Sequence, residues 1–393
     1  MHDIKFLFVP ALIALLSVMP GCREDKIIKI ASHSPLTGEK APSGLGVMRG
    51  AKLACEQLSA PLTELGFKVE FVSYDDQAKP DTGVANAKAI VTDPSILAVV
   101  GHQNSGVHIP SSEIYHGAQL ASISPSTTNP LVTERGYLEV NRICGRDDVQ
   151  GAVGAQFARS RGIRSAYVLH NQTLYGQGIA EYFRKEAAVQ GIQITGIEGT
   201  EEKVNFEALI AKAMARNPEA IYWAGGYESA ALIKLARARG YKGMFLSVDS
   251  FDGPDAASLA GDALLEGQGT YFSTIAGPAF AYPDTARFIS DYKATYGAAP
   301  HPSAAKSFDC AAMILKAIEK TVRANGGEIP SRLDVTNAIR SLGTFPGITG
   351  MITLNGKGDP EKTKYFIIQV TSADPARWAS NRVDKILEIA PPQ

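Results

Sequence analysis

The sequence predicts an α/β protein of two lobes, each built on a doubly wound parallel sheet with helices on both faces. Strand-like and helix-like segments alternate over most of the 393-residue chain, which is typical of βαβ units. Short apolar runs at 97–100 and 121–124 fit buried parallel strands. There are more βα units than one small sheet needs, and their rhythm breaks at 145–148, 267–278 and 345–350. We interpret these breaks as three crossings between the two lobes.

The predicted elements follow a regular order along the chain. Strands are predicted at 27–31, 67–74, 97–100, 121–124, 138–144, 165–170, 192–197, 220–223 and 244–248. Helical spacing of apolar residues predicts helices at 46–60, 82–92, 147–161, 176–189, 206–216, 229–239 and 303–322. Right-handed crossovers between parallel strands place such helices on both faces of a sheet. The tail over 371–393 contains three prolines, and we expect it to form a partly ordered extension of the second lobe.

Composition and charge indicate an ordinary soluble globular body. Hydrophobic residues make up 45% of the chain and charged residues 20%, and the formal net charge is -1. The length is sufficient for two domains with a substantial core. The chain has no long run of Lys and Arg, so we expect no nucleic-acid partner.

The first residues read as an export signal rather than as part of the fold. Lys5 gives a positive start, an apolar run follows over 6–19, and charges begin at Arg23. The apolar run is too short for a membrane-spanning helix. We therefore assign residues 1–21 to a signal peptide and expect the mature protein in the periplasm or on the extracellular face.

Cys22 is the candidate lipid-attachment residue. Gly21 and Cys22 resemble the end of a bacterial lipoprotein signal, although Met19 and Pro20 stand where that pattern prefers Leu and a small residue. If Cys22 is lipidated, this anchor alone tethers the chain to a membrane. The alternative is an ordinary secretory signal.

Small polar residues follow two consecutive strands of the predicted sheet. Gln103 and Ser105 come after the first of the two apolar runs, and Ser126 and Thr128 come after the second. The carboxyl ends of adjacent parallel strands flank a crevice in which ligands bind. Hydroxyls and free backbone N–H groups there suit a carboxylate or another small anion. The alternatives are ordinary loop residues or N-caps of the following helices.

The sequence offers little for metal or covalent chemistry. Cys55, Cys144 and Cys310 lie outside any CxxC or Cys/His cluster, so zinc is not expected. An oxidising compartment permits one disulfide among them, but we expect buried free thiols. Asp75 and Asp76 end a strand with no third oxygen ligand evident nearby, which favours a turn over a metal site. The motifs GxSxG, GxxxxGK[ST] and HExxH are missing, so we expect neither an enzyme nor a cofactor.

A set of short motifs in a fixed order carries a family resemblance. The motifs are Pro35-Leu-Thr-Gly38, Tyr74-Asp-Asp76, Gly101-His102, Ile123-Ser-Pro125, Arg135-Gly-Tyr137, Tyr175-Gly-Gln-Gly178, Gly225-Gly-Tyr227 and Gly356-Lys-Gly-Asp359. In this order they make the chain resemble the periplasmic branched-chain amino-acid-binding proteins, the solute-binding components of ABC importers. The resemblance implies the type I periplasmic-binding-protein fold, or Venus flytrap, in which a ligand binds between two lobes. It also implies a monomer that docks on ABC importer permease subunits.

The resemblance and the three breaks together divide the chain into lobes. Lobe 1 is expected to comprise residues 22–147 and 275–348. Lobe 2 is expected to comprise residues 148–274 and 349–393.

In lobe 1, the resemblance implies three ligand-binding residues. Ser105 matches the hydroxyl that hydrogen-bonds the ligand carboxylate. Ser126 matches the position whose backbone N–H meets that carboxylate and whose carbonyl meets the ligand ammonium. Thr128 matches a residue that binds through both its backbone N–H and its hydroxyl.

In lobe 2, the resemblance implies two aromatic walls and one acid. Tyr175 and Tyr227 match the walls, although packing is the common role of such residues. Asp249 stands where the family carries an acidic partner for the ligand ammonium, usually Glu. Asp249 could instead be a turn or capping residue, and Asp252 competes for its role, but we place Asp249 first because it directly follows the strand predicted at 244–248.

Departures from the family pattern bear on the ligand's side chain. Gln103 replaces an apolar contact, Ser43 stands where some relatives have an aromatic residue, and 304–307 contains no aromatic residue. An unpaired Gln103 amide against an aliphatic ligand would cost about 1–3 kcal/mol. We therefore expect an amino acid or related zwitterion with a polar side chain. The alternatives are a ligand-sensing protein of the same fold and a binder of an amide or aromatic acid.

Overall fold

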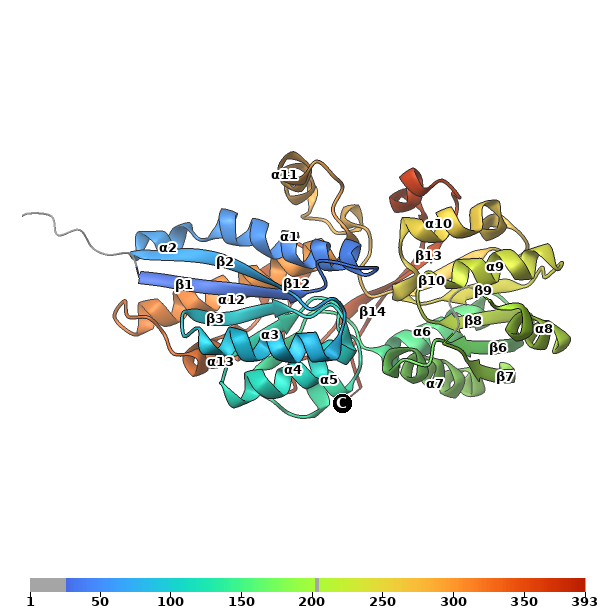
Figure 1. Cartoon of the computed structure of the whole chain (residues 1–393), viewed down its shortest axis with the longest axis horizontal. Coiled ribbons are helices and arrows are strands. Elements are labelled where there is room, and N and C mark those ends of the chain that lie inside the picture. The colour runs from blue at the N-terminus through green and yellow to red at the C-terminus, as the bar shows by residue number, and fades with distance from the viewer. Residues whose placement is uncertain (1–25, 202–204, 393) are drawn as a thin grey trace, which may run out of the picture.

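The computed structural model describes residues 26–201 and 205–392. The expected signal peptide and Cys22 lie outside these residues. The described chain forms two α/β lobes side by side (Figure 1). Within the described ranges, no helix is long and apolar enough to cross a membrane.

Lobe 1 is organised around a five-stranded parallel sheet with the strand order β2-β1-β3-β4-β5. Its strands are β1 (Lys26–Ser34), β2 (Phe67–Asp75), β3 (Ile96–Gly101), β4 (Ala121–Ser124) and β5 (Val140–Arg142). The strands β3 and β4 are buried along their whole lengths, as expected of strands inside a parallel sheet.

Helices cover both faces of the lobe 1 sheet. One face carries α1 (Ala41–Leu58) and α12 (Pro302–Ala324), and the other carries α3 (Pro80–Thr92) and α4 (Ser105–Gly117). The remaining elements of this lobe are α2 (Ala60–Glu64), α5 (Leu131–Glu134), α11 (Ala286–Tyr296), α13 (Arg332–Arg340), β11 (Phe345–Gly347) and β12 (Gly350–Ile352).

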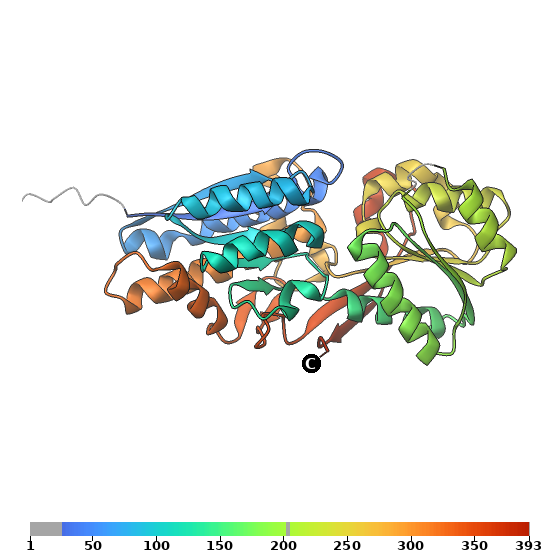
Figure 2. The same cartoon turned by 60° about the horizontal axis from the view of Figure 1, so that its bottom comes forward.

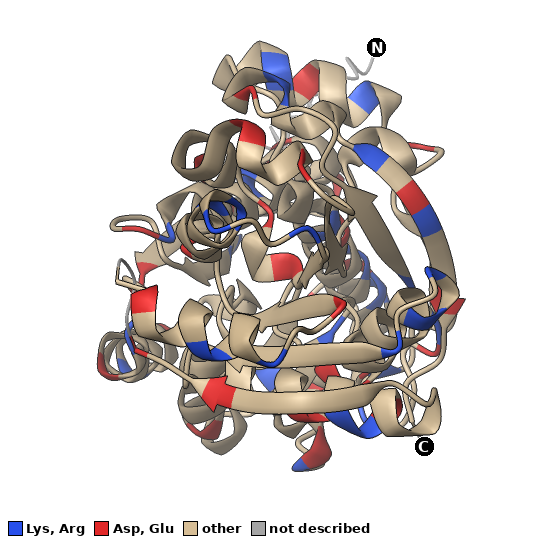
Figure 3. Cartoon of the chain, turned by 90° about the vertical axis from the view of Figure 1, so that its right-hand side faces the viewer, with Lys and Arg blue, Asp and Glu red and all other residues tan. Residues whose placement is uncertain are grey.

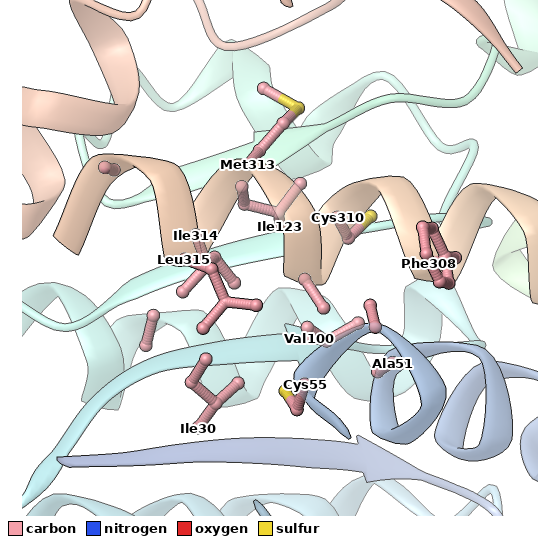
Figure 4. Packing of buried hydrophobic residues seen from close by; sticks show 14 of the residues in the cluster. Ile30, Ala51, Cys55, Val100, Ile123, Phe308, Cys310, Met313, Ile314 and Leu315 are labelled. Atoms are coloured by element: carbon pink, nitrogen blue, oxygen red, sulfur yellow. The ribbon is translucent and has the colours of Figure 1, made fainter. Parts of the chain in front are cut away.

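The main core of lobe 1 lies between the sheet, α1 and α12. Figure 4 shows Ile314 of α12 in the same apolar cluster as Val100 of β3 and Ile123 of β4. The helices α1 and α12 approach each other closely at Gly50, where a Cβ would stand 2.1 Å from the carbonyl oxygen of Ala304. A residue larger than glycine would therefore force the two helices apart.

Lobe 2 contains a seven-stranded sheet with the order β14-β13-β10-β9-β8-β6-β7. Its strands are β6 (Ser165–His170), β7 (Gln193–Gly199), β8 (Ala220–Ala224), β9 (Met244–Ser247), β10 (Thr270–Thr274), β13 (Thr363–Gln369) and β14 (Arg382–Ile389). The five strands from β6 to β10 are parallel, whereas β13 and β14 are antiparallel. The predicted parallel sheet is thus extended at one edge by antiparallel pairs: β13 runs against β10, and β14 runs against β13. The strand β10 leads out toward a crossing and β13 returns from one, so the two run in opposite directions.

Helices also cover both faces of the lobe 2 sheet, as the turned view shows (Figure 2). One face carries α6 (Asp147–Ser160) and α7 (Leu174–Val189). The other carries α8 (Glu207–Ala215), α9 (Ser229–Ala238), α10 (Pro254–Ala260) and the 3-10 helix η4 (Pro375–Ser380). Three further 3-10 helices are η1 (Asp249–Phe251), η2 (Gly261–Leu265) and η3 (Ala279–Ala281).

The C-terminal tail belongs to lobe 2, as expected, but it is more regular than its prolines suggested. Trp378 of η4 is buried in a lobe 2 core, with its ring centroid 6.0 Å from that of Phe272. The strand β14 then pairs with β13 along most of its length. The tail therefore completes the sheet instead of extending from it.

Two of the three crossings lie later in the chain than expected. Tyr282 still packs in a lobe 2 core, whereas Phe288 packs in that of lobe 1. The hairpin of β11 and β12 spans the boundary placed after residue 348, and Ile352 of β12 packs in the lobe 1 core. The sequence breaks marked the neighbourhood of each crossing, but the packing of the flanking side chains sets its position.

Surface charges of both signs are distributed over the two lobes. Figure 3 shows Lys and Arg interspersed with Asp and Glu on the face in view.

The three cysteines of the described residues, Cys55, Cys144 and Cys310, are buried and unbonded, which confirms the expectation of free thiols.

A buried ion pair ties the first crossing to the third. Asp359, in the loop before β13, accepts a hydrogen bond from Arg142 Nε at 2.6 Å and another from Arg146 Nη1 at 3.0 Å. Arg142 ends β5, and Arg146 immediately precedes α6. On the lobe 2 side, the Tyr365 hydroxyl accepts the backbone N–H of Arg146 at 2.7 Å. The side chains of Arg142 and Asp359 are both 0% exposed.

We expect Asp359→Ala to lower the free energy of unfolding by about 3–5 kcal/mol, because it leaves the buried Arg142 charge without its partner. Burial disfavours the ionised form of Asp359, but Arg142, Thr133 and Arg146 outweigh burial and hold its pKa below 3.8. Because the folded pKa is depressed, this stabilisation is present above the ordinary pKa and is lost as pH falls through the folded pKa. Denaturant titration at neutral and acid pH measures both effects.

The matched control is Glu328→Ala, which removes the partner of Lys26 in an ion pair where the Glu328 side chain is 74% exposed. Exposed pairs contribute little, so this variant should unfold nearly as the wild type does. Equal losses in the two variants would contradict the role given to Asp359.

Candidate ligand-binding site

The loops after β3 and β4 lie together at the carboxyl edge of the lobe 1 sheet, because these strands pair in parallel. The Ser126 hydroxyl lies 3.0 Å from the backbone oxygen of Gln103 and 2.7 Å from its amide oxygen Oε1. The Ser105 hydroxyl accepts the backbone N–H of Asn129 at 3.2 Å. The structure thus brings the lobe 1 residues predicted from the sequence to one polar edge.

Neither Ser105 nor Thr128 caps a helix. Ser105 is the first residue of α4, whose N-cap is Asn104 and which has no side-chain cap. Thr128 lies ahead of α5, whose N-cap is Pro130. The capping alternative is therefore wrong for both residues.

Arg142 holds the backbone on both sides of Thr128. Its Nη1 donates to the carbonyl oxygens of Thr127 and Asn129, each at 2.9 Å. The position of Thr128 is therefore set by the same buried guanidinium that pairs with Asp359.

Tyr175 and Asp249 form a direct pair at the carboxyl edge of the lobe 2 sheet. Tyr175 Oη donates to Asp249 Oδ1 at 2.5 Å. Gln150 of α6, which the sequence did not single out, donates from Nε2 to the same oxygen at 3.3 Å. Burial raises the pKa of Asp249, although the hydrogen bonds from Tyr175 and Gln150 oppose that rise. This carboxyl group is thus surrounded by neutral donors.

The structure gives Asp249 and Asp252 different surroundings. Asp252 Oδ1 accepts the indole N–H of Trp378 at 2.8 Å, on the face of lobe 2 that η4 covers. Its side chain is therefore engaged in holding the C-terminal tail. Asp249 is the acid that lies beside Tyr175 and remains the candidate partner for a ligand amine.

Tyr227 reaches across to lobe 1. Burial raises the pKa of its phenol to about 12, and the charge of Glu39 and a hydrogen bond to it add to this rise. The Lys40 Nζ lies 5.3 Å from the centroid of the Tyr227 ring. Glu39 and Lys40 precede α1, so the two lobes are in contact at this tyrosine.

Asp147 lies between the two groups, although the sequence marked it only as the start of a helix. Its backbone N–H donates to the carbonyl of Thr128 at 2.9 Å. Burial raises the pKa of its carboxyl well above 3.8, and the charge of Asp249 adds to this rise. The feature of the sequence that could have marked Asp147 is its position, as an acid directly after a predicted crossing between the lobes.

Comparisons with known proteins identify the family to which the chain belongs. The sequence profile of a family described as "Periplasmic binding protein" matches residues 27–375. The chain belongs to this family. It is a family of solute-binding proteins rather than enzymes, and its members act outside the cytoplasm.

Individual relatives cover nearly all of this binding protein. Leu/Ile/Val-binding protein homolog 2 of Brucella abortus is 32% identical over 378 residues, which cover 95% of this chain and 98% of the relative. The leucine-, isoleucine-, valine-, threonine- and alanine-binding protein of Pseudomonas aeruginosa is 32% identical over 346 residues, which cover 87% and 89% of the two chains. The crystal structure of a leucine-binding protein, LivK, from Thermotoga maritima has a TM-score of 0.80 at 28% identity and covers 92% of this chain and 98% of that one. The resemblance to branched-chain amino-acid-binding proteins and the type I fold are thereby confirmed.

The structure removes part of the argument for a polar ligand side chain. The Gln103 amide oxygen already accepts from Ser126, so an aliphatic ligand would not leave that oxygen unpaired. Around 304–307, Ala304 lies against Gly50 and the Ser307 hydroxyl donates to the Val47 carbonyl at 2.5 Å. These side chains pack on α1, so the missing aromatic residue there does not enlarge a ligand pocket.

A buried histidine group lies in lobe 1 near the binding edge. His33, Asp76 and His102 each bring one possible metal ligand atom within 4.8 Å of the others. The imidazoles of His33 and His102 instead pack on each other with ring centroids 4.1 Å apart, and His102 Nδ1 lies 3.2 Å from Asp76 Oδ2. The Ser124 hydroxyl donates to the His102 backbone oxygen at 2.9 Å. This group supports the loop after β3, and the expectation of no metal stays a prediction.

We expect Tyr227→Phe to increase the radius of gyration of the ligand-free binding protein, because the variant loses the hydroxyl that bonds Glu39 across the lobes. A single hydrogen bond of this kind contributes about 0.5–1.5 kcal/mol, enough to shift the balance between closed and open lobes severalfold. Small-angle X-ray scattering measures the change.

Tyr137→Phe is the matched control. The Tyr137 hydroxyl donates to Glu113 Oε2 at 2.8 Å, and both residues belong to lobe 1. Removing it leaves the contact between lobes intact and should not change the scattering profile. The same expansion in both variants would show that the Tyr227 contact does not hold the lobes together.

Proposed function

We propose that this binding protein captures a small amino acid between its lobes and delivers it to the permease of an ABC importer. The observation that carries the proposal is the division of the site. Hydroxyl groups that suit a carboxylate lie on lobe 1, and the partly buried carboxyl of Asp249, whose pKa is raised by burial, lies on lobe 2. One relative is named a Leu/Ile/Val-binding protein homolog and another is named for binding leucine, isoleucine, valine, threonine and alanine, and both names support the same ligand class.

The proposed mechanism follows from that division. Ser105, Ser126 and Thr128 receive the ligand carboxylate, and Asp249 receives its ammonium. Tyr175 and Tyr227 line the remaining side of the ligand. Only closed lobes present both sets of groups at once, so the ligand binds the closed state more tightly and shifts the population toward it.

The ligand side chain is proposed to be aliphatic or small. The Gln103 amide oxygen is satisfied within the protein, so the pocket does not require a polar side chain. The Pseudomonas aeruginosa relative is named for threonine and alanine as well as the branched-chain amino acids, which supports testing these ligands together.

The finer features of location and assembly are also proposals. A monomer suffices, because each lobe contributes its half of the site from the same chain. Lipidation of Cys22 would keep the protein at a membrane surface, within reach of the permease.

We expect Asp249→Asn to weaken amino-acid binding by about 30-fold or more, because the amide cannot balance the ligand's ammonium charge in a buried site. Isothermal titration with leucine, isoleucine, valine, alanine and threonine measures the change. Because the folded pKa of Asp249 is raised, wild-type affinity should also begin to fall at a pH above the ordinary pKa of 3.8.

Asp252→Asn is the control, since its amide oxygen can still accept from Trp378. This variant should bind as the wild type does. Failure of the wild type to bind any of the five amino acids would refute the proposed function. Unchanged affinity in Asp249→Asn would refute the role of Asp249.

We expect Cys22→Ala to release the protein from the membrane fraction of cells that express the full chain, because the lipid attachment point is lost. Fractionation and metabolic labelling with palmitate measure this. Labelling that persists in the variant, or a wild type that is already soluble, would contradict the lipid anchor.

A further inference from the structure

Asp147 is the buried acid of this binding protein that the proposed mechanism leaves unused. It is the first residue of α6, directly after the first crossing, and it is 0% exposed. Among the residues that the structure describes, neither of its carboxyl oxygens makes a hydrogen bond of normal geometry, although the Thr128 hydroxyl is close enough to lower its pKa.

The arginines that flank Asp147 are committed elsewhere. Arg142 directs its guanidinium to Asp359, to the Thr133 hydroxyl and to the carbonyls around Thr128. Arg146 directs its own to Asp148, Glu134 and Asp359. Neither guanidinium therefore makes an ion pair with the Asp147 carboxyl.

Groups of the candidate site and two flanking residues act on the pKa of Asp147. After burial, the charge of Asp249 raises this pKa and the Thr128 hydroxyl lowers it, while the charge of Arg142 lowers it and that of Asp148 raises it. Asp147 in turn raises the pKa values of Tyr175 and Tyr222. The Tyr222 hydroxyl and the Gln150 amide oxygen are also buried without a hydrogen-bond partner within 26–201 and 205–392. Asp147 and Gln150 lie on the same helix, and Gln150 Nε2 lies 3.3 Å from Asp249 Oδ1, so the two carboxyl groups and the orphaned Gln150 oxygen are neighbours on lobe 2.

An arrangement of this kind is unfavourable in its ionised form unless a cation completes it. A buried carboxylate without a partner loses its hydration and gains nothing in return, and a second carboxylate nearby adds repulsion. Other buried acids in this protein are satisfied: Asp309, for example, accepts hydrogen bonds from Ile348 N at 2.8 Å and Thr349 N at 2.9 Å. Among the buried carboxyl groups of the described residues, Asp147 is the one whose oxygens both lack a partner.

We propose that Asp147 is a second acceptor for the ligand's ammonium group, so that Asp147 and Asp249 hold the amine between them. This inference rests on the proposed function and narrows it. A free amine becomes a requirement for binding, and carboxylic acids that lack one are excluded because they would leave both acids without a cation. Both acids lie on the lobe 2 side of the site: Asp147 begins α6 directly after the first crossing, and Asp249 follows β9.

The experiment compares matched ligands on matched variants. Wild type, Asp147→Asn and Asp148→Asn are titrated calorimetrically with leucine, alanine and threonine, and with their deaminated counterparts 4-methylpentanoate, propanoate and 3-hydroxybutanoate. Asp148 is the control because it begins the same helix but pairs with Arg146. We expect Asp147→Asn to lose about 30-fold or more in amino-acid affinity, while Asp148→Asn retains it. The deaminated acids should not bind the wild type measurably. In Asp147→Asn, the ratio of the amino-acid affinity to the affinity for the deaminated acid should be smaller than in the wild type.

Thermal unfolding of the ligand-free proteins separates a binding role from a structural one. At a pH high enough to ionise Asp147, removing its uncompensated buried charge should raise the melting temperature of Asp147→Asn above that of the wild type while its affinity falls. A structural acid would behave in the opposite way, with the melting temperature lowered.

The outcomes separate a failure of the proposed function from a failure of the role given to Asp147. A wild type that binds none of the amino acids refutes the proposed function, and this inference with it. A wild type that binds an amino acid, with Asp147→Asn unchanged in affinity, overturns the role of Asp147 and leaves the function standing. Lower stability of the ligand-free Asp147→Asn protein would likewise overturn it.

Discussion

Arg142 is the group on which both the hinge and the binding edge depend. A guanidinium excluded from water must be paired and hydrogen-bonded, since an unpaired buried charge is strongly destabilising. Its donors are divided between Asp359, which precedes the third crossing, and the carbonyls on either side of Thr128. One buried charge therefore positions two parts of the chain that are distant in sequence. Arg146 extends the arrangement to lobe 2, because its backbone N–H donates to Tyr365 of β13.

The acids of the protein fall into two groups that differ in how well they are paired. Asp359 and Asp309 are buried with full sets of donors, and they hold loops in place. Asp249 and Asp147 lie where the lobes meet, and basic side chains do not appear among the hydrogen bonds that Asp249 accepts. A fold that satisfies its acids elsewhere accepts this local cost when a ligand can offset it. Such sites usually trade stability of the free protein for affinity.

Closure of the lobes links this electrostatic arrangement to transport. Each lobe has cores of its own, so the lobes can move as units about the crossings. Lobe 1 supplies the donors proposed for the ligand carboxylate, and lobe 2 supplies Asp249. A zwitterion that engages both has a higher affinity for the closed state, and that difference is the free energy available to drive closure. The contact of Tyr227 with Glu39 and Lys40 adds a smaller contribution that is present without ligand.

The sequence by itself determined the fold class, the presence of two lobes and the polar edge after β3 and β4, because local periodicity and the direction of parallel strands encode them. The predicted strands at 121–124 and 165–170 coincide with β4 and β6. The antiparallel pairing of β13 with β10 and with β14 could not be read in this way, since it depends on where the chain re-enters the sheet. The choice between Asp249 and Asp252 required the contact with Trp378, and the environment of Asp147 required a crossing that brings it to Asp249. Only the tertiary structure decides which acids are buried together, because burial and pairing are set by residues far apart in the chain.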